Sequence, residues 1–263
     1  INADKDDAVT VTGRDEIGGA ANFFITGDAS NIRSLGTGGI VTTDSNKPQS
    51  LTVDDASGTT QTGDGNDRLT FGNVSGFVAA GGGNDEIEVS GSVSGAINGG
   101  AGDDTINING SDGVTETGSV LGAEGNDLIS IEGEVAGQVD GGLGDDTISA
   151  KSLVEGGAIS GGEGNDSISI DSIVGGQVDT GDGNDTVDVG IARAGATFIA
   201  SGEQNRIFVD SIGPALDESG SVVADGEATI SFTGGAGADR MGLKSTGEAA
   251  NGSVAVSLNL NGG

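Results

Sequence analysis

The sequence of 263 residues contains no His, Cys, Trp or Tyr, one Met and two Pro. The lack of His excludes Ser-His-Asp and Cys-His catalysis and the common zinc sites. The lack of Cys excludes disulfides and thiolate chemistry. Without Trp or Tyr, the usual aromatic surfaces for stacking sugars or bases are missing. Any chemistry of this chain therefore has to rest on carboxylates, amides, hydroxyls and the backbone.

Basic residues are also scarce. Ten Lys and Arg stand against 41 Asp and Glu, which gives a net charge of −31. This charge excludes nucleic acid and anionic membranes as plausible partners and favours a soluble cation. No apolar run approaches the roughly 18 residues of a membrane span, so we expect no membrane insertion. The chain begins at Ile1 without a basic-then-apolar leader, and we expect that any secretion signal was removed or never lay at this end.

Glycine is the most prominent residue that is present, with 53 copies. Ile and Val far outnumber Leu, and branched side chains favour strands over helices. From residue 62 a glycine-rich hexapeptide recurs seven times, at starting intervals of 18, 19, 23, 19, 20 and 19 residues. The copies are TGDGND (62–67), AGGGND (80–85), GGAGDD (99–104), GAEGND (122–127), GGLGDD (141–146), GGEGND (161–166) and TGDGND (180–185). A degenerate eighth copy is expected at SGEQNR (201–206).

The residues around each hexapeptide alternate between apolar and polar. Two and four residues after the final Asp stand apolar residues such as Ile129 and Ile131, with a polar residue between them. A second apolar position precedes each hexapeptide by two residues from the second copy onward, from Val78 to Ile199. Each unit therefore predicts a loop, a short strand, a second turn and a second short strand. Units of about 19 residues with this much glycine are too short for helix-containing repeats.

Stacking of these units as coils predicts an all-β fold. We expect a right-handed parallel β-roll or β-solenoid rising ~4.8 Å per unit, with loops along one edge and β-rich caps. The expected boundaries are an N-terminal cap or assembly region at 1–61, the repeats at 62–206, and a C-terminal cap or assembly region at 207–263. GGAGAD (234–239) is a possible further loop around Asp239. The final SVAVSLNL (253–260) is either the last strand of a cap or an edge that pairs with another copy.

Stacking also places the sixth-position acids above one another. Carboxylates about 5 Å apart repel by roughly 3 kcal/mol per pair at an effective dielectric of about 20. Calcium fits the need for a cation, because it takes 6–8 oxygens from carboxylates and carbonyls. The alternative is that Asp, Asn and Gly serve as turn formers, but turn chemistry does not require Asp over Asn at this position every time. The predicted calcium ligands are Asp67, Asp85, Asp104, Asp127, Asp146, Asp166 and Asp185.

The hexapeptide and the apolar residues after it resemble the nonapeptide of the repeats-in-toxin (RTX) calcium-binding β-roll, over about residues 62–206. The resemblance implies calcium held between loops by the sixth-position Asp and loop carbonyls. It also implies type I secretion from a bacterium and folding in millimolar external calcium. The chain departs from the family because the motif occurs once per coil instead of twice. This single-sided layout is similar to the ice-binding region of giant bacterial adhesins, but here the third position carries no row of Thr.

We therefore expect a secreted, calcium-stabilised structural protein on the cell surface or outside the cell. It would associate with itself into a homopolymer, as a fibre, surface layer or matrix. The alternatives are an adhesin segment or an ice-binding or surface-binding module of a larger RTX protein. A calcium roll accessory to an exported enzyme is also open, although no separate catalytic domain is visible. We expect no enzymatic activity, because acidic pairs such as Asp103 and Asp104 repeat as scaffold.

Overall fold

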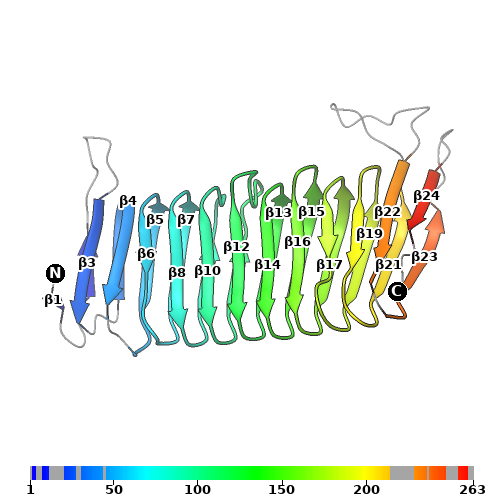
Figure 1. Ribbon diagram of the computed structural model, residues 1–263. Helices are drawn as coiled ribbons and strands as arrows, with labels where there is room; N and C mark the ends of the chain where they lie inside the picture. Colours follow the sequence, from blue (N-terminus) through cyan, green and yellow to red (C-terminus); the bar gives the residue numbers. More distant parts are fainter. Residues whose placement is uncertain are drawn as a thin grey trace.

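The computed structural model describes residues 2–3, 8–11, 21–27, 31–43, 46–213, 228–235, 237–246 and 254–259, with side chains in 46–213, 230–235 and 237–243. The described chain forms 24 strands joined by turns, and all of their pairings are parallel. None of the described residues lies in a helix that could cross a membrane. The strands stack as coils along one axis (Figure 1). The predicted all-β parallel solenoid is confirmed.

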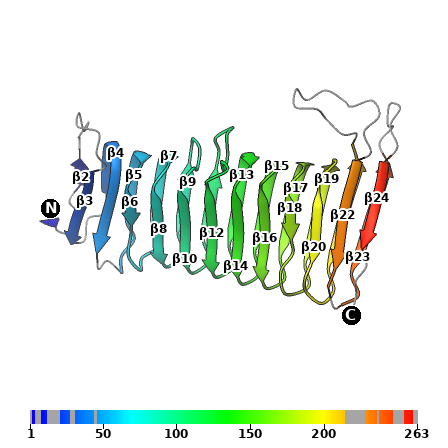
Figure 2. The ribbon, with the colours of Figure 1, turned by 45° about the horizontal axis from the view of Figure 1, so that its top comes forward.

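Two rows of parallel strands make up each coil (Figures 1 and 2). Strand β4 (Asn31–Thr43) is long enough to contribute to both rows. Sheet 1 otherwise contains β2 (Ala8–Val11), β5 (Ser50–Ala56), β7 (Arg68–Val74), β9 (Glu86–Val89), β11 (Thr105–Ile108), β13 (Leu128–Val135), β15 (Thr147–Val154), β17 (Ser167–Val174), β19 (Thr186–Ala192), β21 (Arg206–Ile212) and β23 (Arg240–Thr246). Sheet 2 contains β1 (Asn2–Ala3), β3 (Ala21–Gly27), β6 (Thr59–Gln61), β8 (Phe77–Gly82), β10 (Ala96–Ala101), β12 (Ser119–Glu124), β14 (Gln138–Leu143), β16 (Ala158–Glu163), β18 (Gln177–Asp179), β20 (Thr197–Ala200), β22 (Ala228–Gly234) and β24 (Val254–Asn259).

The core lies between the two sheets and follows from the alternation in the sequence. Ile129 and Ile131 of β13 point inward and are at most 2 % exposed, while Ser130 between them faces outward. Val120 of β12 packs from sheet 2, and every coil repeats this arrangement in register. A third inward row runs through Val74, Val93, Val114 and Val135, where the chain turns between the sheets. Each coil alone could not bury these rows, so the stacking itself makes the core.

The predicted hexapeptides form one edge of the solenoid. They follow the sheet-2 strands and lead into the sheet-1 strands, so their loops line the lower edge in Figure 1. The opposite edge carries the second turn of each coil, and the extra residues of the 23-residue interval lie there, between β11 and β12. All candidate metal ligands are thus gathered on one edge.

The same parallel stacking continues on both sides of residues 62–206. β5 pairs with β7 and with β4 before this range, and β22 pairs with β20 and β24 after it. The roles of the terminal regions as caps or assembly surfaces stay predictions. One expected inward residue is wrong: Phe198, not Ile199, takes the place of Val178 in the next coil and is fully buried. The eighth hexapeptide begins at residue 200 and not at 201, because Ile199 is the equivalent of Asp179, so the inward position also lies one residue earlier than expected.

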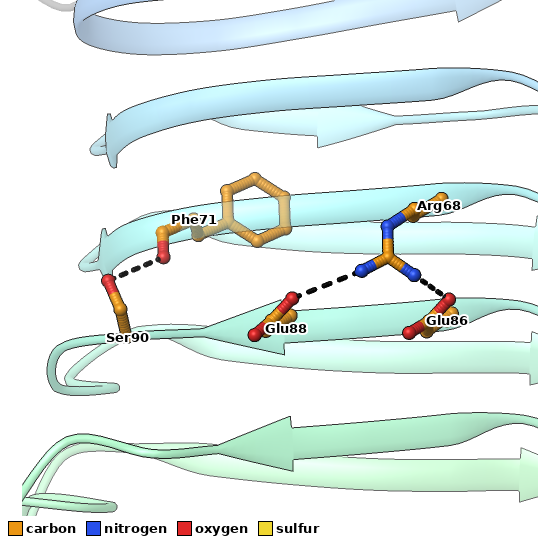
Figure 3. A network of polar contacts seen from close by, with 5 residues as sticks. All are labelled: Arg68, Phe71, Glu86, Glu88 and Ser90. Atoms are coloured by element: carbon orange, nitrogen blue, oxygen red, sulfur yellow. Dashed lines mark hydrogen bonds and ion pairs between the residues drawn. The ribbon is translucent and has the colours of Figure 1, made fainter.

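Charge on the outer face of sheet 1 is paired locally. Arg68 of β7 forms ion pairs with Glu86 and Glu88 of β9, and all three side chains are exposed (Figure 3). In the same pair of strands the Ser90 hydroxyl donates to the carbonyl of Phe71 at 3.2 Å. Such exposed pairs contribute little to stability, because water already solvates the charges. The carboxylates of the loop edge are in a very different environment.

Candidate metal centre

The seven predicted ligands form a single column along the loop edge. Each lies directly before a sheet-1 strand, and the register of these strands stacks each one on its equivalent in the next coil. Their side chains are only 0–3 % exposed. We call this set, defined by Asp67, Asp85, Asp104, Asp127, Asp146, Asp166 and Asp185, the aspartate column. The structure therefore brings together all seven residues that the sequence singled out.

One oxygen of each carboxylate is used in a ladder of hydrogen bonds between coils. The backbone N–H of Asp104, for example, donates to Oδ1 of Asp127 at 2.7 Å. The six equivalent bonds between column members are 2.7–2.9 Å long. These are charge-assisted bonds to buried backbone donors, which fix the rotamer of every carboxylate. The column is thus held rigid before any ligand is considered.

Among the described residues, the other oxygen, Oδ2, has no partner within hydrogen-bond distance in any of the seven buried carboxylates. Only at Asp67 and Asp185 does a nearby hydroxyl, that of Thr62 or Thr180, oppose the rise in the pKa of the carboxyl. Oδ2 points toward the first residue of its own hexapeptide. A Cβ on Gly99 would lie 2.7 Å from the carbonyl oxygen of Gly122 and closer still to Oδ2 of Asp104. The same crowding by a carboxylate oxygen and a next-coil carbonyl occurs at Gly122, Gly141 and Gly161. Two acceptors facing one space cannot bond to each other, so this space requires a cation or a donor.

The electrostatics of the protein alone confirm that this arrangement is costly. Burial raises the pKa of Asp85 to about 8, and the neighbouring Asp67 and Asp104 add to the shift. Burial likewise raises the pKa of Asp104 and Asp146 to about 7, and that of Asp67 and Asp166 to about 6. In each of these groups a backbone N–H opposes the effect. The charges that act on the column are those of other carboxylates, which oppose ionisation, so the column would favour a positive charge placed beside it.

The glycines at the second and fourth positions allow the loops to turn. Gly142 and Gly144, for example, have φ values of 117° and 122°, which side chains rarely adopt. In one coil the second position is Ala123, at φ 94°. This residue keeps the left-handed turn despite its Cβ, so the stacking of the neighbouring coils imposes the loop conformation on it.

A second column lies beside the first. The fifth-position residues are exposed, as predicted for outward turn residues, but they also form a ladder that the sequence did not reveal. Here the N–H of one residue donates to Oδ1 of its equivalent in the preceding coil, at 2.7–3.2 Å. An Asn amide or an Asp carboxylate accepts equally well, which explains why both occur. This fifth-position column is Asn66, Asn84, Asp103, Asn126, Asp145, Asn165 and Asn184.

The ladder of the aspartate column continues beyond its two ends, which the sequence reading missed. Before Asp67, the N–H of Gln49 donates to Asp67 Oδ1 at 2.7 Å. After Asp185, Asn205 and then Asp239 take the same position, with bonds of 2.9 and 3.1 Å. The eighth copy therefore ends at Asn205 and not at Arg206, which instead pairs with Thr186. Counting back two residues from the first inward residue, Leu51, Ile207 or Met241, would have found all three.

The donor chemistry of the column fits a calcium ion. The unpartnered Oδ2 atoms are hard carboxylate oxygens, and backbone carbonyls such as that of Gly122 lie beside them; both are ligands that calcium prefers. Within the described residues no group of three or more acidic side chains converges on one point. Each ion would therefore be held by one or two column carboxylates and completed by loop carbonyls. This agrees with a glycine-rich loop, which can turn its carbonyls inward.

Comparisons with known proteins support the fold. No family model matches the chain, and no curated protein sequence matches it. Among solved structures, the chain is similar to the crystal structure of a hyperactive, Ca²⁺-dependent, β-helical antifreeze protein from an Antarctic bacterium. The two share 21 % identity with a TM-score of 0.58, over 96 % of this chain and 82 % of the other. This likeness establishes a common β-helical architecture.

Proposed function

We propose that this protein is a calcium-stabilised β-solenoid whose folded state depends on calcium bound along the aspartate column. The observation that carries the proposal is the set of seven buried Oδ2 atoms without a partner. The calcium dependence stated for the antifreeze protein of similar fold supports it. The resident ion would supply the positive charge that the column lacks, and its binding free energy would become folding free energy.

The chain's own residues prepare the column for this role. The backbone N–H donors of successive coils hold each Oδ1, which leaves Oδ2 as the free ligand. The loop carbonyls of the next coil, such as that of Gly122 beside Asp104, face the same space. The surrounding core excludes water, because Ile106 and Ile129 next to the column are fully buried. The low local dielectric then strengthens attraction between the carboxylates and a cation.

We further propose that the protein is secreted, works at or outside the bacterial cell surface, and assembles with copies of itself into a fibre, layer or matrix. Millimolar calcium is available outside cells, and sites of moderate affinity are filled only there. Each coil presents the same rows of side chains, so a contact made by one coil is repeated by the next. A net charge of −31 opposes association, which makes calcium a suitable trigger for assembly.

We also propose that the protein is not an enzyme. Its buried carboxylates repeat coil after coil and do not converge on one cavity, whereas acid–base catalysis needs a few groups directed at one reacting bond. The second candidate function is that of an adhesin or surface-binding segment, ice included. The outer rows of β11, β15 and β17, which carry small polar residues such as Thr105, Thr147 and Ser169, favour it.

A calcium titration of the metal-free protein tests the proposal. We expect the midpoint of thermal unfolding, followed by circular dichroism of the β-sheet spectrum, to be low in chelator and to rise steeply as calcium reaches millimolar concentration, with several ions bound per chain by native mass spectrometry. The same midpoint in excess chelator and in calcium, with no bound calcium on addition, would contradict it. Light scattering and negative-stain microscopy at raised calcium should show fibres or sheets. A strictly monomeric protein that slows ice growth would favour the second candidate.

A further inference from the structure

The aspartate column is bounded by amide side chains at both ends. Asn205 follows Asp185 in the column and is 1 % exposed. Its Oδ1 accepts the N–H of Asp185 at 2.9 Å, as an Asp would. Its Nδ2 occupies the place of the free Oδ2 and has no hydrogen-bond partner. Asn205 thus keeps the backbone ladder and replaces a negative acceptor by a neutral donor.

The carboxylate beyond Asn205 differs from the seven in the column. Oδ1 of Asp239 accepts the N–H of Asn205 at 3.1 Å, and its Oδ2 accepts the N–H of Gly235 at 2.9 Å. Both oxygens therefore have partners from the protein itself. Neither oxygen of Asp239 is left free to bind a cation. The row of unpartnered carboxylate oxygens therefore ends before Asn205.

The other end is closed in a similar way. Gln49 precedes Asp67 in the column, is 4 % exposed, and has no hydrogen-bond partner at either amide atom. Its N–H still donates to Asp67 Oδ1 at 2.7 Å. A buried amide without partners is unfavourable. A carboxylate at this position would instead extend the line of charge beyond the first hexapeptide, which begins at residue 62.

We infer that Asn205 and Gln49 are end stops of the cation column: they continue its backbone ladder while withholding the ligand charge, and so limit ion binding to the seven Asp coils. The inference rests on the proposed calcium binding and adds where the binding ends. Asn205 is the sharper stop, because it lies between two carboxylates, Asp185 and Asp239. A single atom exchange, NH₂ for O, would join them into one longer column.

The substitution Asn205→Asp tests this directly, with native mass spectrometry of the full chain in calcium as the count of bound ions. We expect the wild-type chain to bind no more than seven ions and the variant to bind at least one more. Asn184→Asp is the matched control, because it makes the same exchange at an exposed fifth-position residue whose backbone N–H keeps its bond to Asn165 Oδ1. The control should leave the ion count unchanged.

A second measurement keeps the test independent of the ion count. In chelator, Asn205→Asp should lower the midpoint of thermal unfolding, because it adds a buried negative charge between Asp185 and Asp239. In calcium it should raise the midpoint, and Asn184→Asp should change neither by a comparable amount. The reverse exchange, Asp185→Asn, should remove one ion and still fold, because Asn205 shows that an Asn fits this position.

The outcomes separate the two claims. If the wild-type chain binds no calcium, the proposed function fails. If it binds calcium but Asn205→Asp neither adds an ion nor reverses the sign of its effect between chelator and calcium, the end-stop inference is wrong and the proposed function stands. A wild-type count above seven would likewise overturn the inference, because ions would then lie beyond the Asp coils.

Discussion

The fifth-position and sixth-position columns run side by side along one edge, and they differ in burial and in the direction of their hydrogen-bond ladders. Both use Oδ1 to accept a backbone N–H from a neighbouring coil, at similar distances. In the fifth-position column the side chains are exposed, and Asn and Asp alternate freely. In the sixth-position column they are 0–3 % exposed, and all seven are Asp. The hydrogen-bond ladder therefore requires only an acceptor oxygen, which Asn and Asp both provide. Only the sixth position, where a second oxygen is buried without a partner, requires the charged Asp side chain.

The largest contrast between the columns should appear in the pH dependence of the metal-free protein. The buried column carboxyls have pKa values raised above 3.8, to about 8 at Asp85. The folded state therefore binds more protons than the unfolded state, and the free energy of unfolding falls as pH rises from about 4 to 8. Each such carboxyl contributes up to about 1.4 kcal/mol per pH unit inside its window. Thermal unfolding in chelator at several pH values measures this.

Matched variants assign that pH dependence to the buried column. Asp85→Asn should make the dependence shallower, while Asp103→Asn in the exposed column should change it less, because Asp103 acts on the column only as a neighbouring charge at Asp104 and Asp127. Asp145 of the exposed column has a pKa lowered by the N–H and amide of Asn165, the opposite direction. Saturating calcium should abolish the loss at high pH, because ionised carboxylates are then the bound form. A metal-free protein that gains stability from pH 4 to 8 would refute the assignment.

Truncation to alanine should separate the two columns next. Asp127→Ala removes the acceptor of the buried Asp104 N–H as well as one ion ligand. We expect a loss of about 2–4 kcal/mol in the free energy of unfolding in calcium, since a buried donor is left unpaired. Asn126→Ala should cost less than about 0.5 kcal/mol, because water replaces its exposed bonds. Urea unfolding gives both values, and equal losses would mean that burial does not distinguish the columns.

Replacing a column Asp by Asn removes the charge and keeps the shape of the side chain. The resulting change in the free energy of unfolding should be smaller, and its sign should differ between chelator and calcium. In chelator, Asp127→Asn should stabilise the fold by about 1 kcal/mol or more, because it removes a buried and repelled charge. In calcium the same variant should destabilise the fold and bind fewer ions. The opposite exchange next door, Asn126→Asp, removes the exposed amide that donates to Asp103 and should lower stability slightly, with the same sign in both conditions. Thermal unfolding with and without calcium tests the crossover, and a change of the same sign in both would argue against a cation in the column.

The smallest expected effect concerns the turn that orients both columns. Ala123 adopts φ 94°, where equivalent positions such as Gly142 carry glycine. Ala123→Gly should remove backbone strain of roughly 1–2 kcal/mol, because Gly adopts positive φ freely. Part of this stabilisation should be offset, because Gly also increases the conformational entropy of the unfolded chain. We expect a net stabilisation of about 0.5–1 kcal/mol in thermal unfolding. Ala101→Gly, at a third position without positive φ, is the control and should be neutral or slightly destabilising.

Much of the site could be read from the sequence because it repeats. Seven copies with an invariant sixth position predict that Asp67 to Asp185 lie in one column. The ends could not be read in the same way, because Gln49 and Asn205 stand in degenerate hexapeptides that share only the strand phase after them. Asp239 is predicted as a possible loop, but its link to the column through Asn205 depends on a contact between residues 34 positions apart, a longer interval than any in the repeat. The fifth-position ladder also escaped, since a mixture of Asn and Asp is ordinary in turns.

The sequence by itself determined the coil, because a repeated alternation of inward and outward residues can bury its apolar rows only by stacking. It also determined which acids share a column, since residues at the same position of each repeat lie at the same point of successive coils. The tertiary structure alone decided which oxygen of each carboxylate is engaged and which is left free. That division depends on how a loop from one coil meets the backbone of the next. Contacts such as the 2.7 Å bond from Asp104 N–H to Asp127 Oδ1 are set by this fit, which no residue pattern encodes.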